Sequence, residues 1–98
     1  VYISDVIDAL STASTANTIN HSVINIGSGK ASSLIDMVKA INETMSIELD
    51  PIYNSSESGG VREMCADISQ ATKKLKYQPR TSLLEGLKRT VAIDQRYQ

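Results

Sequence analysis

The sequence predicts a small α/β domain of about four helices and three or four short strands. Three observations lead to this fold class. Apolar side chains recur at helical spacing in several stretches, and short β-branched runs that end in turn residues alternate with those stretches. A chain of 98 residues can bury one small core. We therefore expect residues 1–98 to form a single domain.

The first half of the chain predicts a strand, a helix and a second strand. Residues 1–3 are β-branched or aromatic and should be extended, and Ser4 or Asp5 is a suitable cap for the helix that follows. Residues 22–27 form a β-branched run that ends at a glycine and should be a buried strand. The inner face of the helix should carry four apolar residues, which are Val6, Ala9, Leu10 and Ala13.

The clearest helix should follow Ser33, which stands three residues before Asp36 in the spacing of a capping box. One face of this helix is apolar and comprises Leu34, Met37, Val38, Ile41 and Met45. Residues 47–53 predict a strand at a sheet edge, because Pro51 within them lacks the backbone donor of a ladder. Residues 54–60 have the composition of a loop.

The last third predicts an extended segment and two helices. Residues 61–68 should be extended, and Asp67 or Ser69 should start a short helix that ends before Pro79. Ser82 and Glu85 have the spacing of a second capping box at the start of the final helix. The inward side chains of that helix should be Leu83, Leu84, Leu87 and Val91.

Composition excludes several classes of function. Ten Lys and Arg against eleven Asp and Glu give a net charge of −1, which argues against nucleic acid or an anionic membrane as a partner. We find no apolar run long enough for a membrane span. Cys65 is the single cysteine, so there is no internal disulfide, and we expect a cytoplasmic protein. One cysteine and one histidine also exclude the usual four-ligand zinc site, so we expect no metal. The chain begins at Val1 without a signal peptide, and we expect it to be part of a longer protein.

The glycine turn at residues 27–30 resembles a phosphate-binding loop because it connects a predicted strand to a predicted helix. A Walker loop would need glycine at position 24 and serine or threonine at position 31, where Ile24 and Ala31 stand. A dinucleotide fingerprint would need a third glycine in place of Ser32. Both motifs fail, and a structural turn is the favoured interpretation.

Few side chains suggest chemistry. The guanidinium of Arg62 suits a phosphate or a carboxylate, although an ion pair with Glu57, Glu63 or Asp67 is the simpler interpretation. Cys65 should be a small core residue and His21 a surface residue. Asp5 and Asp8 should cap and solvate their helix.

Three stretches resemble NAD-dependent nucleotide-sugar epimerases and dehydratases, which belong to the extended short-chain dehydrogenase/reductase family. They are "VYISDVIDAL", "INIGSGKASSLIDMVKAI" and "SGGVREMCADISQATKKLKYQPRTSLLEGLKRTV". They occur in the family's order, and the resemblance extends over essentially the whole chain. The last stretch is the most specific and looks most like the UDP-sugar 4-epimerase branch, an isomerase of the UDP-glucose or UDP-N-acetylglucosamine type. The resemblance implies that this chain is the nucleotide-sugar-binding C-terminal part of a longer enzyme.

In that family an N-terminal Rossmann domain holds NAD and the catalytic Tyr and Lys. This chain contains neither "GxxGxxG" nor "YxxxK". The resemblance therefore implies that the parent enzyme uses NAD. It also implies that this chain binds no cofactor, carries no catalytic residue and has no turnover by itself. It implies substrate-binding roles for Arg62 and Tyr2. The missing Rossmann domain is an expected partner, and its absence should expose an apolar patch through which the chain self-associates.

The sequence also departs from the family pattern. Glu57 stands where the family often has an Arg that contacts the diphosphate, and Gly60 replaces an Asp. Lys76 replaces a Gly, and we expect this change to cost little stability because it lies at a helix end or in a turn. These departures leave open whether the chain binds a nucleotide sugar. The alternatives are a fragment of a nucleotide-sugar 4,6-dehydratase and a non-catalytic interaction module that retains the fold.

Overall fold

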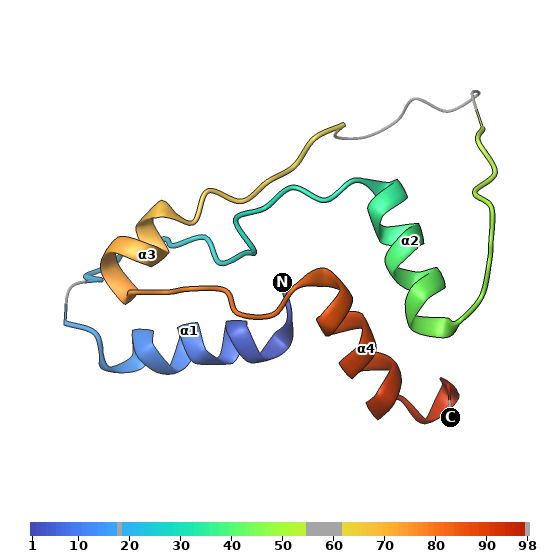
Figure 1. Ribbon diagram of the computed structural model, residues 1–98. Coiled ribbons are helices and arrows are strands. Elements are labelled where there is room, and N and C mark those ends of the chain that lie inside the picture. Colours follow the sequence, from blue (N-terminus) through green and yellow to red (C-terminus); the bar gives the residue numbers. More distant parts are fainter. Residues whose placement is uncertain (18, 55–61, 98) are drawn as a thin grey trace. The chain divides into compact units, whose positions relative to one another are not determined.

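The computed structural model describes residues 1–17, 19–54 and 62–97. Within these residues the chain forms four α-helices joined by extended segments (Figure 1). The helices are α1 (Ile3–Thr15), α2 (Leu34–Met45), α3 (Ser69–Leu75) and α4 (Leu83–Ile93), and a 3-10 turn η1 (Gln95–Tyr97) follows. The chain divides into two compact units, which comprise residues 1–30 with 65–82 and residues 31–64 with 83–98.

The prediction of a mixed α/β domain is wrong for the described residues, because they contain helices and no strand. Residues 22–27, 47–53 and 62–68 lie outside helices, and Ile3 belongs to α1. The physical reason lies in how the two structures are hydrogen-bonded. A helix satisfies its backbone groups within itself, whereas a strand needs a neighbouring backbone. β-Branched composition shows that a segment suits a pleated surface but supplies no partner.

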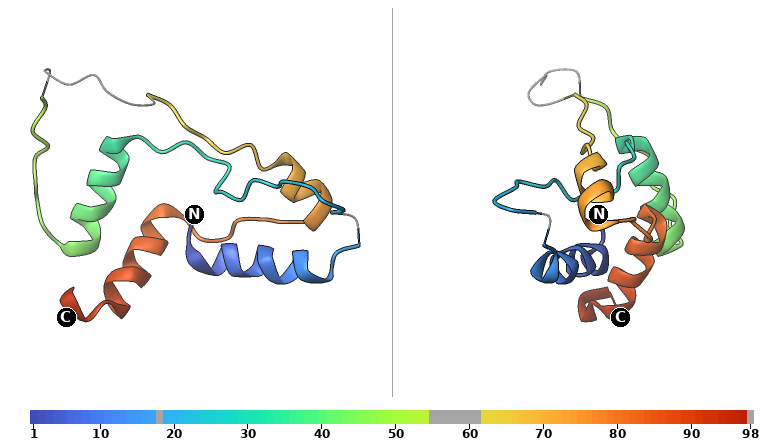
Figure 2. Two further views of the ribbon diagram at one scale, coloured as in Figure 1. Left: turned by 180° about the vertical axis from the view of Figure 1, so that it is seen from behind. Right: turned by 90° about the vertical axis from the view of Figure 1, so that its left-hand side faces the viewer.

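The first unit has a small core between α1 and α3. Its four buried residues are Ala9 of α1, Ala71 and Leu75 of α3, and Tyr77 just after α3. Partly buried apolar residues surround them and include Ile24, Ile26 and Ile68. The segment that follows α3 runs alongside α1 in Figure 1 and in the left view of Figure 2. This arrangement brings residues 77–81 beside α1.

The buried face of α1 differs from the predicted one. Asp5 and Ala9 are the buried residues of this helix, and they lie one turn apart. Leu10, which was expected to face inward, is 65% exposed. Neither predicted cap holds, because the N-cap is Tyr2 and has no side-chain capping bond. The backbone carbonyl of Tyr2 instead accepts hydrogen bonds from the N–H groups of Asp5 and Val6.

In the second unit α2 packs against α4, and the two helices lie side by side in Figures 1 and 2. The capping box that starts α2 is confirmed. Ser33 Oγ accepts from the Asp36 N–H, and an Asp36 carboxylate oxygen accepts from the Ser33 N–H, both at 3.0 Å. These bonds hold the pKa of Asp36 below its usual value. The Lys88 ammonium pairs with the Glu43 carboxylate at 3.0 Å, which links α4 to α2.

The second unit buries little apolar surface among its described residues. α2 has no buried residue, and Leu34 on its predicted inner face is 80% exposed. Leu83 of α4 is also exposed, and Gly86 is the buried residue of that helix. The helical spacing was therefore predicted correctly, but much of the apolar face is open to solvent.

Candidate functional site

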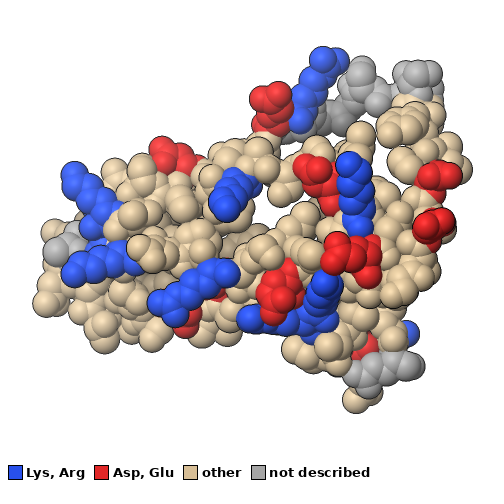
Figure 3. Space-filling model, in the orientation of Figure 1, with Lys and Arg blue, Asp and Glu red and all other residues tan. Residues whose placement is uncertain are grey.

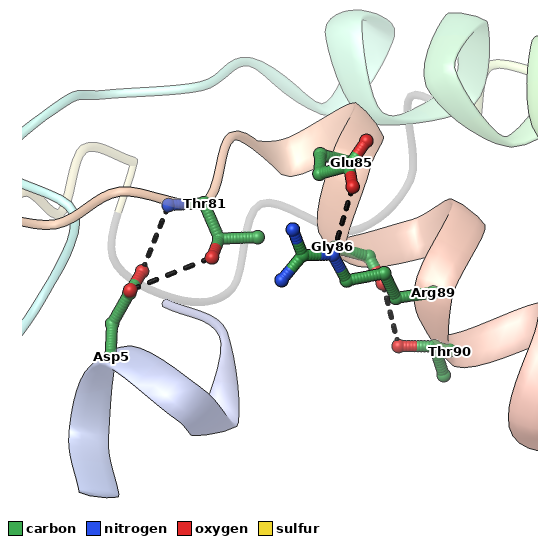
Figure 4. A network of polar contacts seen from close by, with 6 residues as sticks. All are labelled: Asp5, Thr81, Glu85, Gly86, Arg89 and Thr90. Carbon is green, nitrogen blue, oxygen red and sulfur yellow. Dashed lines mark hydrogen bonds and ion pairs between the residues drawn. The ribbon is translucent and has the colours of Figure 1, made fainter. Parts of the chain in front are cut away.

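The first unit contains a carboxylate that two parts of the chain share. Asp5 is 3% exposed, and its Oδ2 accepts a hydrogen bond from the backbone N–H of Thr81 at 3.1 Å. The Thr81 hydroxyl lies 3.5 Å from Asp5 Oδ1 (Figure 4). The expectation that Asp5 caps and solvates its helix is thus wrong, because a buried carboxylate needs donors and the segment after α3 supplies them.

Tyr77 makes the second polar connection in this unit. Its hydroxyl donates to the backbone carbonyl of Gly27 at 2.9 Å inside the core. Burial and, second, the negative charge of Asp5 raise the pKa of Tyr77 above its usual value. The ring is therefore held neutral and keeps its proton for Gly27.

A shallow hollow opens beside this core. α1 contributes Asp8, Ala9 and Thr12 to its lining, and the end of α3 and the following segment contribute Leu75, Lys76, Tyr77, Gln78 and Arg80. Both charge signs therefore face the hollow. In Figure 3, which has the orientation of Figure 1, several Lys and Arg side chains lie over the part of the first unit that contains α3. Lys73 and Lys74 occupy the last turn of α3, where positive charge favours the helix dipole.

Lys76 ends α3 in the left-handed region, with φ 52° and ψ 30°. Glycine adopts this conformation without strain, whereas other residues are disfavoured there. We expected lysine to cost little stability at this position, but the backbone conformation there favours glycine, so the lysine should be destabilising.

The glycines of the turn lie close to side chains of the same unit. A Cβ on Gly27 would lie 2.7 Å from the Ala66 Cβ, and one on Gly29, whose φ is +66°, would lie 2.7 Å from Ile68 Cδ1. The side chains of Ala66 and Ile68 thus occupy the space that a side chain at either glycine would need. The helix start that follows is also occupied, because the Asp36 carboxylate already bonds there. These glycines serve close packing, in agreement with the structural interpretation of the turn.

The two predicted substrate-binding residues lie in different units. Arg62 belongs to the second unit and is exposed. Three residues were the alternative ion-pair partners of Arg62. Neither Glu63 nor Asp67 pairs with it in the described part of the chain. Glu57, the third, and Gly60, the other departure from the family pattern, lie outside the described residues. Tyr2 is half-buried at the start of α1 in the first unit. Their roles toward a substrate remain predictions.

The remaining candidates show no site in the described ranges. Cys65 is exposed, so the prediction of a small core residue is wrong. His21 is exposed, as expected, and adopts a positive φ of 52°. No group of three or more His, Cys, Asp or Glu in residues 1–17, 19–54 and 62–97 is placed to hold a metal ion. The helices formed by these same residues are too short or too polar to cross a membrane.

Thr81 was missed by reasoning from the sequence, because its contribution is mainly a backbone N–H. A signal for Asp5 was present, since it stands four residues before Ala9 and eight before Ala13 on one helix face. A carboxylate on the face that carries the small apolar residues predicts a buried partner.

The chain is similar to three longer proteins. It is 32% identical over 91 residues to a UDP-glucuronate 4-epimerase of Thermodesulfobacterium geofontis, which covers 92% of this chain and 28% of that protein. It is 30% identical over 87 residues to a dTDP-L-rhamnose 4-epimerase of Burkholderia thailandensis, covering 89% of this chain and 24% of the epimerase. An uncharacterised protein of Methanocaldococcus jannaschii is 30% identical over 88 residues, which is 90% of this chain and 27% of that protein.

No family model and no solved structure matches the chain. The chain spans about a quarter of the length of the curated relatives it matches. Two of the three are sugar-nucleotide 4-epimerases by name, and the similarity extends over nearly all of this chain. The comparisons therefore support a relationship between this chain and one part of such epimerases.

Proposed function

We propose that this chain is the nucleotide-sugar-binding C-terminal part of an NAD-dependent sugar-nucleotide 4-epimerase and that it has no turnover by itself. The observation that carries the proposal is the similarity over about nine-tenths of the chain to two 4-epimerases. Both are named for a sugar joined to a nucleoside diphosphate, although the base and the sugar differ. The shared substrate class is thus a nucleoside-diphosphate hexose, and we propose a UDP sugar of the glucose or N-acetylglucosamine type.

The proposal assigns this chain to binding and the rest of the parent to chemistry. NAD carries out the oxidation and reduction at C4 of the sugar when it is bound to the parent. The glycine turn of this chain packs against the side chains of Ala66 and Ile68. We therefore assign the cofactor to the part of the parent outside residues 1–98. Binding energy from the remote nucleotide can orient the reacting sugar carbon, which is the contribution a binding part makes to catalysis.

Arg62 is the residue we propose for the diphosphate. It is exposed, and within the described residues it is not engaged by Glu63 or Asp67. A guanidinium forms paired hydrogen bonds to phosphate oxygens, so an exposed arginine that pairs with neither Glu63 nor Asp67, next to a glycine-containing stretch, is suited to this contact. We assign a second substrate contact to Tyr2.

The test uses the complete product of the gene that encodes this chain. We expect the full-length protein to bind UDP and to interconvert the C4 epimers of a UDP hexose in the presence of NAD. The 98-residue chain should give no epimer under the same conditions. Epimer formation by the short chain above a protein-free blank, or absence of both binding and turnover in the full-length protein, would contradict the proposal.

Arg62→Ala in the full-length protein should weaken UDP binding by about 10- to 100-fold, because a hydrogen bond to a charged group contributes about 1.5–3 kcal/mol. Arg89→Ala is the matched control, since Arg89 is an exposed arginine on α4 that pairs with Glu85 at 2.8 Å. Isothermal titration with UDP measures both variants. Equal binding by Arg62→Ala and the parent protein would remove Arg62 from the substrate site.

A further inference from the structure

Residues 23–26 have the side-chain alternation of a strand but no neighbouring strand among the described residues. Ile24 and Ile26 are partly buried and pack against the core of the first unit. Val23 is 94% exposed and Asn25 is exposed, so the side chains alternate between core and solvent. This alternation with a period of two is what a half-buried β-strand shows. Figure 1 draws the segment as an extended ribbon between α1 and α2.

The backbone of this segment is open for pairing. Among the described residues, none forms a hydrogen bond with the N–H or C=O groups of residues 23–26. The segment is nevertheless fixed at its end, because the Gly27 carbonyl accepts from Tyr77. An extended backbone that is fixed at its end, and whose donors and acceptors have no partner within residues 1–17, 19–54 and 62–97, is a template to which another strand can add.

We propose that residues 23–26 form an open sheet edge that pairs with a β-strand from the part of the same polypeptide outside residues 1–98. This inference rests on the proposed function, which makes the chain part of a longer protein. About three-quarters of the length of each relative lies outside the matched region, so a protein of that length has ample chain to supply the strand. A strand in the same polypeptide also has a high effective concentration at this edge, which favours it over a second copy.

The partner strand needs two features. Its backbone must supply donors and acceptors in register with residues 23–26. It must also carry an apolar or β-branched side chain across from Val23, because this valine is 94% exposed and a cross-strand apolar side chain would cover it. Such pairing explains why a run with strand composition is extended yet belongs to no sheet here.

Hydrogen exchange of the full-length gene product tests the proposal. Every second amide of residues 23–26 should exchange at least about 100-fold more slowly than unprotected amides, because one neighbouring strand engages alternate N–H groups and those ladder hydrogen bonds must open first. Val23→Glu should reduce this protection by about 10-fold or more, whereas Val23→Thr, which keeps the β-branched shape, should largely retain it. In the 98-residue chain the same amides should exchange at the unprotected rate.

Three results would overturn the proposal. The first is a gene that encodes no chain beyond these residues, and the second is a full-length protein whose residues 23–26 are unprotected. The third is protection in the 98-residue chain that rises with its concentration, because a second copy would then be the partner. Unprotected amides in a protein that still epimerises its substrate contradict this inference only. Protected amides in a protein without nucleotide-sugar binding contradict the proposed function only.

Discussion

Asp5 accepts a hydrogen bond from the backbone N–H of Thr81, 76 positions further along the chain, and thereby ties the segment after α3 to the first helix. This carboxylate is 3% exposed, so water replaces the donor poorly if the contact is lost. Polar links of this kind between distant segments contribute to the specificity of a small core as well as to its stability.

Removal of this carboxylate should destabilise the first unit. We expect Asp5→Ala to lower the free energy of unfolding by about 1.5–3 kcal/mol, the range for a hydrogen bond to a charged group, because the Thr81 N–H loses its acceptor. Asp8→Ala is the matched control, since Asp8 is an exposed carboxylate one turn further along α1. Urea unfolding followed by circular dichroism compares the two. If Asp5→Ala lowers the free energy of unfolding no more than Asp8→Ala does, the Asp5–Thr81 hydrogen bond makes no net contribution to stability.

Tyr77→Phe should destabilise the protein and change its response to alkaline pH. The variant leaves the buried Gly27 carbonyl without its donor, which costs about 1–3 kcal/mol. Because the folded state raises the pKa of Tyr77, the unfolded chain ionises first, and stability is lost as pH rises above about 10. The phenylalanine variant should lack this part of the alkaline decline.

Unfolding midpoints measured between pH 8 and pH 11 test the Tyr77 prediction. Tyr53→Phe is the control, since Tyr53 is 76% exposed. An alkaline decline of equal slope in Tyr77→Phe and the parent chain would assign the decline to other groups.

Lys76→Gly should stabilise the protein. Lys76 has a positive φ, which costs a non-glycine residue about 1–2 kcal/mol. The variant also loses a cation at the end of α3, worth about 0.3–1 kcal/mol, so we expect a net gain of roughly 0.5–1 kcal/mol. Lys73→Gly within α3 should instead destabilise by about 0.5–1 kcal/mol. Thermal unfolding of both variants shows whether the signs are opposite, and equal signs would contradict the backbone explanation.

Gly27→Ala should destabilise the first unit by about 1–3 kcal/mol, because its Cβ would lie 2.7 Å from that of Ala66. The double variant Gly27→Ala with Ala66→Gly should recover part of the loss, since it removes the atom that clashes. A double-mutant cycle with both single variants isolates the interaction. If the changes in unfolding free energy of the two single variants simply add, the destabilisation by Gly27→Ala does not come from its contact with Ala66.

The sequence predicted the helices better than the rest of the fold, for a local reason. The Ser33–Asp36 capping box and the start of α3 at Ser69 depend on residues a few positions apart, and both are confirmed. A strand depends on a distant partner, and the segment at residues 22–27 therefore had the composition of a strand without being part of a sheet among the described residues.

The same distinction limits what the sequence indicates about function. Asp5 has its structural role because it accepts a hydrogen bond from Thr81. The glycine turn has its role because Ala66 and Ile68 pack against it. Neither contact follows from the local spacing of residues. Family resemblance was the more informative signal, because two 4-epimerases match the chain over most of its length. The substrate-binding roles of Arg62 and Tyr2 depend on that resemblance, and the titration of Arg62→Ala with UDP tests the first of the two.

The first unit is assembled from residues 1–30 and 65–82, so its two pieces are separated by the stretch 31–64. During translation the first helix leaves the ribosome long before α3 and Tyr77 are made, and until then its inner face lacks three of the four buried residues of the core, Ala71, Leu75 and Tyr77. Closure must also bring together pieces separated by a long loop, at an entropic cost that grows with the logarithm of loop length. Synthesis therefore delays folding of this unit until its last third has emerged, and the nascent chain depends on staying soluble through that interval.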